Sequence, residues 1–190
     1  MDIIKIFKSK ARQAIFRLYF SNPDKAFYLR ELERELAMPV SMIRKELISL
    51  EKEGIFKSDK KGNQLYYSLN KRYPLFNELK SIVFKTVGIK ASLSNILLNI
   101  KGIDAAFIYG SYANNSENAK SDIDLFILGK PDEDLLIGQI NKLEKDLKRD
   151  INYSIYPKTD FEKKKNQKDS FIEDLLKNKK IFLIGDKNEL

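Results

Sequence analysis

Two short apolar runs lie close together in the middle of the sequence, at residues 103–109 and 123–128. Both are rich in aliphatic and aromatic residues, so we expect two buried strands. Asp122 and Asp124 flank Ile123 where the second run begins. Side chains alternate along a strand, so both carboxylates point to one face while Ile123 packs on the other. Two adjacent carboxylates repel each other, and the pattern therefore predicts a divalent cation between them.

The first run is followed directly by Gly110 and Ser111. Glycine lets the backbone approach a phosphate closely, and the serine hydroxyl can donate a hydrogen bond to it. Two carboxylates form a small set of hard oxygen ligands, which suits Mg²⁺ shared with the phosphates of a substrate. An Asp-x-Asp triplet alone also fits a solvated strand end. The Gly-Ser pair and the two apolar runs favour a site for nucleotidyl transfer instead.

Residues 110–124 read Gly-Ser, a spacer, and then Ser-Asp-x-Asp. This pattern resembles the signature of the DNA polymerase β-like nucleotidyltransferase superfamily, and most of all its minimal nucleotidyltransferase branch. The resemblance implies an α+β domain with a mixed sheet and flanking helices, which binds a nucleoside triphosphate with Mg²⁺ in a one- or two-metal site. It also implies that Asp122 and Asp124 are the catalytic metal ligands, and that Gly110 and Ser111 contact the phosphates.

Three positions depart from the pattern of that branch. Asn114 and Asn115 stand where the branch usually has Arg and then Gly, which removes one phosphate contact. The superfamily takes a third carboxylate from a later strand, and the matching residue here is Asn152. An Asn cannot take a proton and binds Mg²⁺ weakly, so this change bears on catalysis. Asp150, two residues earlier on the same strand face, is the other third-position candidate, although a surface charge is its simpler interpretation.

The chain has 190 residues, with no Cys and no His. Their absence excludes a disulfide framework, a thiolate zinc site and Ser-His or Cys-His catalysis, and leaves carboxylates as the strong metal ligands. No apolar run approaches membrane-spanning length, and the start lacks the apolar segment and cleavage site of a signal peptide. We therefore expect a cytoplasmic protein without a membrane partner.

The positive charge is concentrated in the first half of the chain. Residues 1–88 carry 18 Lys and Arg against 10 Asp and Glu, a net charge of +8. Residues 89–190 carry 17 of each kind, a net charge of zero, so the halves add to the totals of 35 and 27. Such an excess is typical of nucleic-acid binding, although a solvated basic surface would have the same composition.

Helical spacing in the first half predicts helices over residues 4–19 and 28–36, and a third helix that Ser41 caps and that ends before Gly54. Ile43, Leu47 and Leu50 of the third helix recur at the spacing of one helix face, so we expect them in the core. The residues left to face outward are Ser41, Met42, Arg44, Lys45 and Ser49.

A hairpin is expected over residues 55–69, with a basic turn at residues 60–63. Its second strand alternates, with Leu65, Tyr67 and Leu69 on one face. Three helices followed by a hairpin are the layout of a winged helix. Residues 40–55 and 62–70 are similar to the recognition helix and the wing of ArsR-type regulators. The resemblance implies double-stranded DNA as a partner, contacted by Ser41, Arg44, Lys45, Lys60 and Lys61; the alternative is a winged helix used only for protein contact.

We therefore expect a winged helix-turn-helix domain over residues 1–72, a linker helix over residues 73–88 and a nucleotidyltransferase-like domain over residues 89–190. The linker helix has one apolar stripe, formed by Leu75, Leu79, Ile82 and Val83. This stripe can pack on its own domain or pair two subunits as a homodimer. In the last domain we expect helices over residues 89–100 and 136–147, and strands over residues 151–156 and 180–185.

The whole arrangement resembles a group of prokaryotic predicted regulators, and it leaves three functions open. The first is a DNA-binding regulator whose second domain binds, and in the active case transfers, a nucleotide. The second is an enzyme that attaches a nucleotide to a protein or a small molecule, as minimal nucleotidyltransferase antitoxins do to partner toxins. The third is a DNA-binding protein with an inert transferase-fold domain. The basic first half favours the first function over the second.

Overall fold

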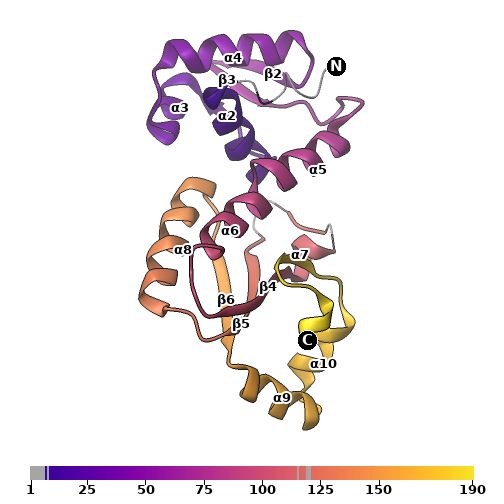
Figure 1. The fold of residues 1–190 in the computed structure, drawn as a ribbon. Coiled ribbons are helices and arrows are strands. Elements are labelled where there is room, and N and C mark those ends of the chain that lie inside the picture. The colour runs from indigo at the N-terminus through magenta and orange to yellow at the C-terminus, as the bar shows by residue number, and fades with distance from the viewer. Residues whose placement is uncertain (1–6, 8, 115, 119–120) are drawn as a thin grey trace. The chain divides into compact units, whose positions relative to one another are not determined.

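The computed structural model describes residue 7 and residues 9–114, 116–118 and 121–190. The chain divides into two compact units, whose ribbon is drawn in Figure 1. Unit 1 comprises Met1–Ala91 with Asp146–Lys148, and unit 2 comprises Ser92–Lys145 with Arg149–Leu190. Among the described residues, no helix has both the length and the apolar composition that a bilayer crossing requires.

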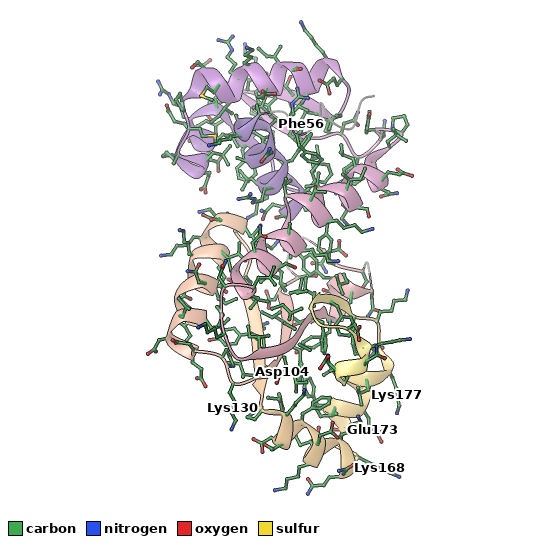
Figure 2. The ribbon with its side chains drawn as sticks, in the orientation of Figure 1. Phe56, Asp104, Lys130, Lys168, Glu173 and Lys177 are labelled. Carbon is green, nitrogen blue, oxygen red and sulfur yellow. The ribbon has the colours of Figure 1, made fainter. Side chains whose placement is uncertain are left out.

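Unit 1 combines helices with a small antiparallel sheet of order β1-β3-β2. In chain order its elements are α2 (Lys10–Ser21), β1 (Phe27–Tyr28), α3 (Leu29–Leu36), α4 (Val40–Lys52), β2 (Phe56–Lys61), β3 (Gln64–Leu69) and α5 (Phe76–Thr86). One buried cluster unites these elements, and Phe56, labelled in Figure 2, belongs to it. Leu79 and Val83 of α5 lie in the same cluster, so α5 packs on unit 1.

The two faces of α4 are as the sequence predicts. Ile43, Leu47 and Leu50 are fully buried. Ser41, Met42, Arg44 and Lys45 are exposed, and Ser49 is half-buried. The partly buried guanidinium of Arg12, on α2, donates to Glu46 over 2.7 Å and to Ser49 over 3.0 Å, which ties α4 to α2. The core and this polar contact together hold the outer face of α4 in place.

One predicted helix start in unit 1 lies outside the described residues, and one predicted helix cap is wrong. The first described helix, α2, begins at Lys10, with Ser9 as its N-cap, and ends at Ser21. The predicted start near Ile4 lies outside the described residues. The predicted cap of α4 is wrong, because the carbonyl of Pro39 already accepts from the amides of Met42 and Ile43. Ser41 therefore lies inside the first turn of α4 and is not its N-cap.

One residue of each of two predicted apolar faces is exposed, and the turn is shorter than predicted. Leu75 is 47% exposed, because α5 begins only at Phe76. Leu65 is 41% exposed, because it lies near the tip of the hairpin, beyond the reach of the core. Strand β2 continues through Lys61, so the turn contains only Gly62 and Asn63. The turn is therefore two residues shorter than the sequence predicts.

Unit 2 is built on a four-stranded sheet of order β6-β5-β4-β7. Its elements are α6 (Ile89–Leu97, whose first turn falls in unit 1), β4 (Ile103–Tyr109), α7 (Gly110–Ala113), β5 (Ile123–Gly129), α8 (Glu133–Leu147), β6 (Ile151–Tyr156), α9 (Lys158–Asn166), α10 (Ser170–Lys177), β7 (Ile181–Ile184) and a 3₁₀ turn (Lys187–Glu189). Strands β5 and β6 are parallel, whereas β4 is antiparallel to both β5 and β7. The sheet is therefore mixed, and the fold is α+β.

One face of this sheet is covered by the C-terminal helices. Phe107 and Phe126 lie in a buried cluster with Phe161 of α9 and with Ile172 and Leu175 of α10. The predicted strands at residues 103–109 and 151–156 match β4 and β6. Because side chains alternate along a strand, Tyr109, two positions after Phe107, lies on the same face as Phe107. Asp124, two positions before Phe126, lies on that face for the same reason. These residues are the ones that build the site described next.

Candidate functional site

Strand β5 pairs with the end of β4 on one side and with the start of β6 on the other, so one residue from each of the three strands lies in a single row across the sheet. In the sheet register Tyr109 lies opposite Asp124, and Asp124 lies beside Asn152. Asp122 precedes β5 and is exposed, and the side-chain amide of Asn152 donates to its Oδ2 over 3.2 Å. The structure thus places Asp122, Asp124 and Asn152 together at one end of the mixed sheet.

The two carboxylates disfavour each other in this position. The pKa of Asp124 is raised, first by burial and then by the charge of Asp122, and a hydrogen bond with Asn152 opposes this shift. A cation beside the pair would relieve both unfavourable effects. Within the described part of the chain, no group of three or more Asp, Glu, His or Cys side chains is arranged to hold a metal. Two carboxylates suit a cation that takes its other ligands from phosphate and water, as Mg²⁺ does.

Gly110 lies against the second of these carboxylates. It follows β4 directly, has φ +66°, and a Cβ built on it would lie 2.3 Å from Oδ2 of Asp124. The positive φ therefore favours glycine, and a side chain at this position would require the Asp124 carboxylate to move. Ser111 is half-buried in α7, and its carbonyl accepts from the amide of Ser116 over 3.0 Å. The predicted phosphate-binding pair thus adjoins the predicted metal pair.

The remaining predicted residues of unit 2 are less closely involved. Asp150 is exposed just before β6, and its backbone carbonyl accepts from the amide of Ile123 over 2.9 Å. The side chain that hydrogen-bonds to the carboxylate pair is that of Asn152. Asn114 is exposed at the end of α7, and Asn115 lies outside the described residues.

Sequence reasoning missed two residues near the site. Tyr109 is the register partner of Asp124, and its pKa is raised by burial and then by the charge of Asp124, against a hydrogen bond with Ser154. Its position directly before Gly110 is a signal that could have found it. Arg149 is buried to 7% exposure between α8 and β6. No periodicity marks Arg149, because its partners lie about 30 residues earlier in the chain.

The predicted DNA-contacting residues all lie in unit 1. Ser41, Arg44 and Lys45 occupy the exposed face of α4. Lys60 and Lys61 are exposed at the end of β2, next to the turn at Gly62. The ammonium of Lys61 lies 5.4 Å from the centre of the Tyr66 ring, within the range of a cation–π contact.

Comparison with protein families identifies one match. The family model described as "Polymerase beta, Nucleotidyltransferase" matches residues 91–188. No curated protein matches the chain. Among solved structures, a toxin–antitoxin crystal structure with AMP-PNP is similar to 53% of this chain over 76% of its own chain, with 19% identity and a TM-score of 0.37. A crystal structure of a mutant of the toxin–antitoxin MntA-HpeT is similar over 53% and 77%, with 17% identity and a TM-score of 0.38.

The contact between Gly110 and Asp124 predicts an unequal effect of two Gly→Ala substitutions. Gly62 also has a positive φ, of +58°, but no atom lies within 4 Å of a Cβ built there. Gly62→Ala should therefore lower the free energy of unfolding by the backbone strain alone, about 1–2 kcal/mol. Gly110→Ala should lower it further, because the new methyl group must displace the Asp124 carboxylate. Denaturant unfolding of both variants measures the difference, and equal losses would show that the close contact is absent.

Proposed function

Since the chain belongs to the polymerase β nucleotidyltransferase family, we propose that unit 2 binds a nucleoside triphosphate together with Mg²⁺. The observation that carries this proposal is the position of Gly110 against the paired carboxylates Asp122 and Asp124. In the proposed complex the two carboxylates hold the cation, and Gly110 and Ser111 lie at the phosphates. When bound, Mg²⁺ would neutralise charge on the phosphate oxygens. The residues present fit this ion, because they offer hard oxygen ligands and leave its coordination open to phosphate.

We expect nucleotide transfer by unit 2 to be slow or undetectable, because Asn152 occupies the place of the third carboxylate. Its amide hydrogen-bonds to Asp122, so it lies where a third ligand would be needed. An amide cannot take a proton from an acceptor hydroxyl, and it is a weak ligand for a second cation. Docking of a triphosphate needs only one metal and the phosphate contacts. We therefore expect binding to survive better than turnover.

The metal assignment predicts the effect of removing both charges. Asp122→Asn combined with Asp124→Asn should abolish Mg²⁺-dependent binding of nucleoside triphosphates, because neutral amides cannot replace two carboxylates at the cation. Isothermal calorimetry with each ribonucleoside triphosphate, with and without Mg²⁺, measures this. Asp150→Asn is the matched control, since Asp150 is exposed and its recorded bond is made by the backbone. If the double variant bound Mg²⁺ and nucleotide like the parent protein, the site assignment would be wrong.

The third position predicts a gain of activity. Asn152→Asp should raise nucleotide transfer to an acceptor or to the protein itself, because it restores a carboxylate beside Asp122 and Asp124. Intact-protein mass spectrometry detects transfer as the added mass of a nucleoside monophosphate. Asp150→Asn should change this rate little. A strong native rate that Asp150→Asn removes would instead identify Asp150 as the third ligand and the chain as a working enzyme of the antitoxin-like or small-molecule kind.

For unit 1 we propose a winged-helix domain that binds double-stranded DNA, which makes the whole chain a nucleotide-binding transcriptional regulator. We assign residues 1–72 to this domain, residues 73–88 to the helix that follows and residues 89–190 to the transferase-like domain. The specific observation in favour is that Arg44 and Lys45 are exposed on α4 while the opposite face of α4 is buried. The exposed Lys60 and Lys61 beside the hairpin turn would contact phosphate. The net charge of +8 in residues 1–88 supports the same partner.

DNA binding should respond differently to the two pairs of basic residues. Lys60→Ala with Lys61→Ala should weaken binding evenly across sequences and flatten its salt dependence, because phosphate contacts carry no sequence information. Arg44→Ala should cost about 1–3 kcal/mol and relax sequence preference if Arg44 reads a base. Fluorescence anisotropy with a selected and an unrelated duplex, at several salt concentrations, separates the two effects.

The control for this experiment removes the same charge from the other unit. Lys142→Ala with Lys145→Ala takes two exposed lysines from α8 and should leave the affinity for both duplexes unchanged. Unchanged affinity in the Lys60, Lys61 and Arg44 variants as well would exclude DNA binding through this surface.

A further inference from the structure

Arg149 is a buried charge that the proposed nucleotide site does not yet explain. It lies between the end of α8 and the start of β6, and only 7% of it is exposed. Burying a guanidinium is unfavourable unless its donors are satisfied. Its surroundings therefore indicate what it supports.

The guanidinium bonds to Asn118 and Ser121, two described residues of the segment that leads into β5. Nη1 of Arg149 donates to the carbonyl of Asn118 over 3.2 Å and to the carbonyl of Ser121 over 3.1 Å. Asn118 and Ser121 also bond to each other, because the amide of Asn118 donates to Oγ of Ser121 over 2.9 Å and the amide of Ser121 donates to the carbonyl of Asn118 over 3.2 Å. The residue that follows Ser121 is Asp122.

The residues that follow Arg149 in the sequence also contact the segment around Asp122. Asp150, the next residue, accepts through its carbonyl from the amide of Ile123 over 2.9 Å. Asn152, two positions further, hydrogen-bonds to Asp122. One short segment, residues 149–152, therefore contacts the chain before, at and after Asp122. Hydrogen bonds from a charged donor are about twice as strong as neutral ones, so the Arg149 contacts are well suited to hold the backbone of Asn118 and Ser121 in place.

We propose that Arg149 is a positioning residue for the metal site, which holds the backbone of Asn118 and Ser121 in place and thereby aims the carboxylate of Asp122. This inference rests on the proposed function of unit 2, because it assigns Asp122 to Mg²⁺. The proposal requires no contact of Arg149 with the cation or the phosphates. It requires only the donation to the backbone carbonyls of Asn118 and Ser121.

The test compares Arg149→Met, which removes the donors but keeps much of the length, with Arg149→Lys, which keeps the charge and a donor. The matched controls are Arg17→Met and Arg17→Lys, because Nε of Arg17 also donates to a backbone carbonyl, that of Val87, within unit 1. Three quantities are measured in the full chain. These are the melting temperature, the affinity for ATP with Mg²⁺ and with the metal chelated, and hydrogen exchange in peptides spanning residues 111–125.

Arg149→Met should weaken Mg²⁺-dependent ATP binding roughly 10- to 100-fold, the usual loss when the support of a metal ligand is removed. Metal-free binding should change much less, and exchange should accelerate in the peptides that contain Asn118 and Ser121. Arg149→Lys should lie between Arg149→Met and the parent protein, because an ammonium can replace part of the donation. The Arg17 variants should alter neither the Mg²⁺ dependence nor exchange in these peptides.

Two results would overturn the inference. One is an unchanged Mg²⁺ dependence in Arg149→Lys and in folded Arg149→Met. The other is a proportional loss of metal-dependent and metal-free binding that follows the melting temperature, which would mean that Arg149 only supports the core. If the parent protein bound no nucleotide, the proposed function would fail instead. Hydrogen exchange still tests the Arg149 contact in that case, and exchange unaltered in both variants would exclude it.

Discussion

The position of β5, between an antiparallel and a parallel neighbour, is the constraint on which the site depends. The register of β5 with β4 and β6 places Tyr109, Asp124 and Asn152 in one row. A slip of one residue would turn Asp124 to the opposite face of the sheet. Core packing two positions further along the same strands opposes such a slip. There the rings of Phe107 and Phe126 stack with their centres 5.1 Å apart, in the core covered by α9 and α10. The apolar core thus determines which polar residues meet at the end of the sheet.

The residue that best stabilises the polar end of this row differs between the cation-free and the cation-bound site. Without one, Asp122 and Asp124 repel each other, and burial adds to the raised pKa of Asp124. The amide of Asn152 donates to Asp122 and adds no negative charge, so it stabilises the cation-free arrangement. A carboxylate in its place would add a third like charge, while it would improve the coordination of a second metal. Asn152 therefore favours a site that is stable when empty over one that is equipped for turnover.

Local patterns predicted much of this fold, whereas contacts between distant segments escaped prediction. The strands at residues 103–109 and 151–156 and the buried face of Ile43, Leu47 and Leu50 follow from periodicity, which depends on neighbours in the chain. The predicted cap at Ser41 was wrong because the carbonyl of Pro39, two residues earlier, already begins α4. The buried position of Arg149 depends on carbonyl groups about 30 residues earlier in the chain. A local sequence pattern contains no information about such a distant partner. It therefore does not distinguish a buried arginine from an exposed one.

The chain divides into two compact units, and any regulation of one by the other must meet a thermodynamic condition. A nucleotide can change DNA affinity only if it binds two states of the chain with different affinity, since equal affinity shifts no equilibrium. The coupling is reciprocal, so DNA would change the affinity for nucleotide by the same factor. A site that binds without efficient transfer suits this role, because the ligand persists long enough to bias the equilibrium. The proposed replacement of a third carboxylate by Asn152 therefore suits a nucleotide that acts as a signal rather than as a substrate.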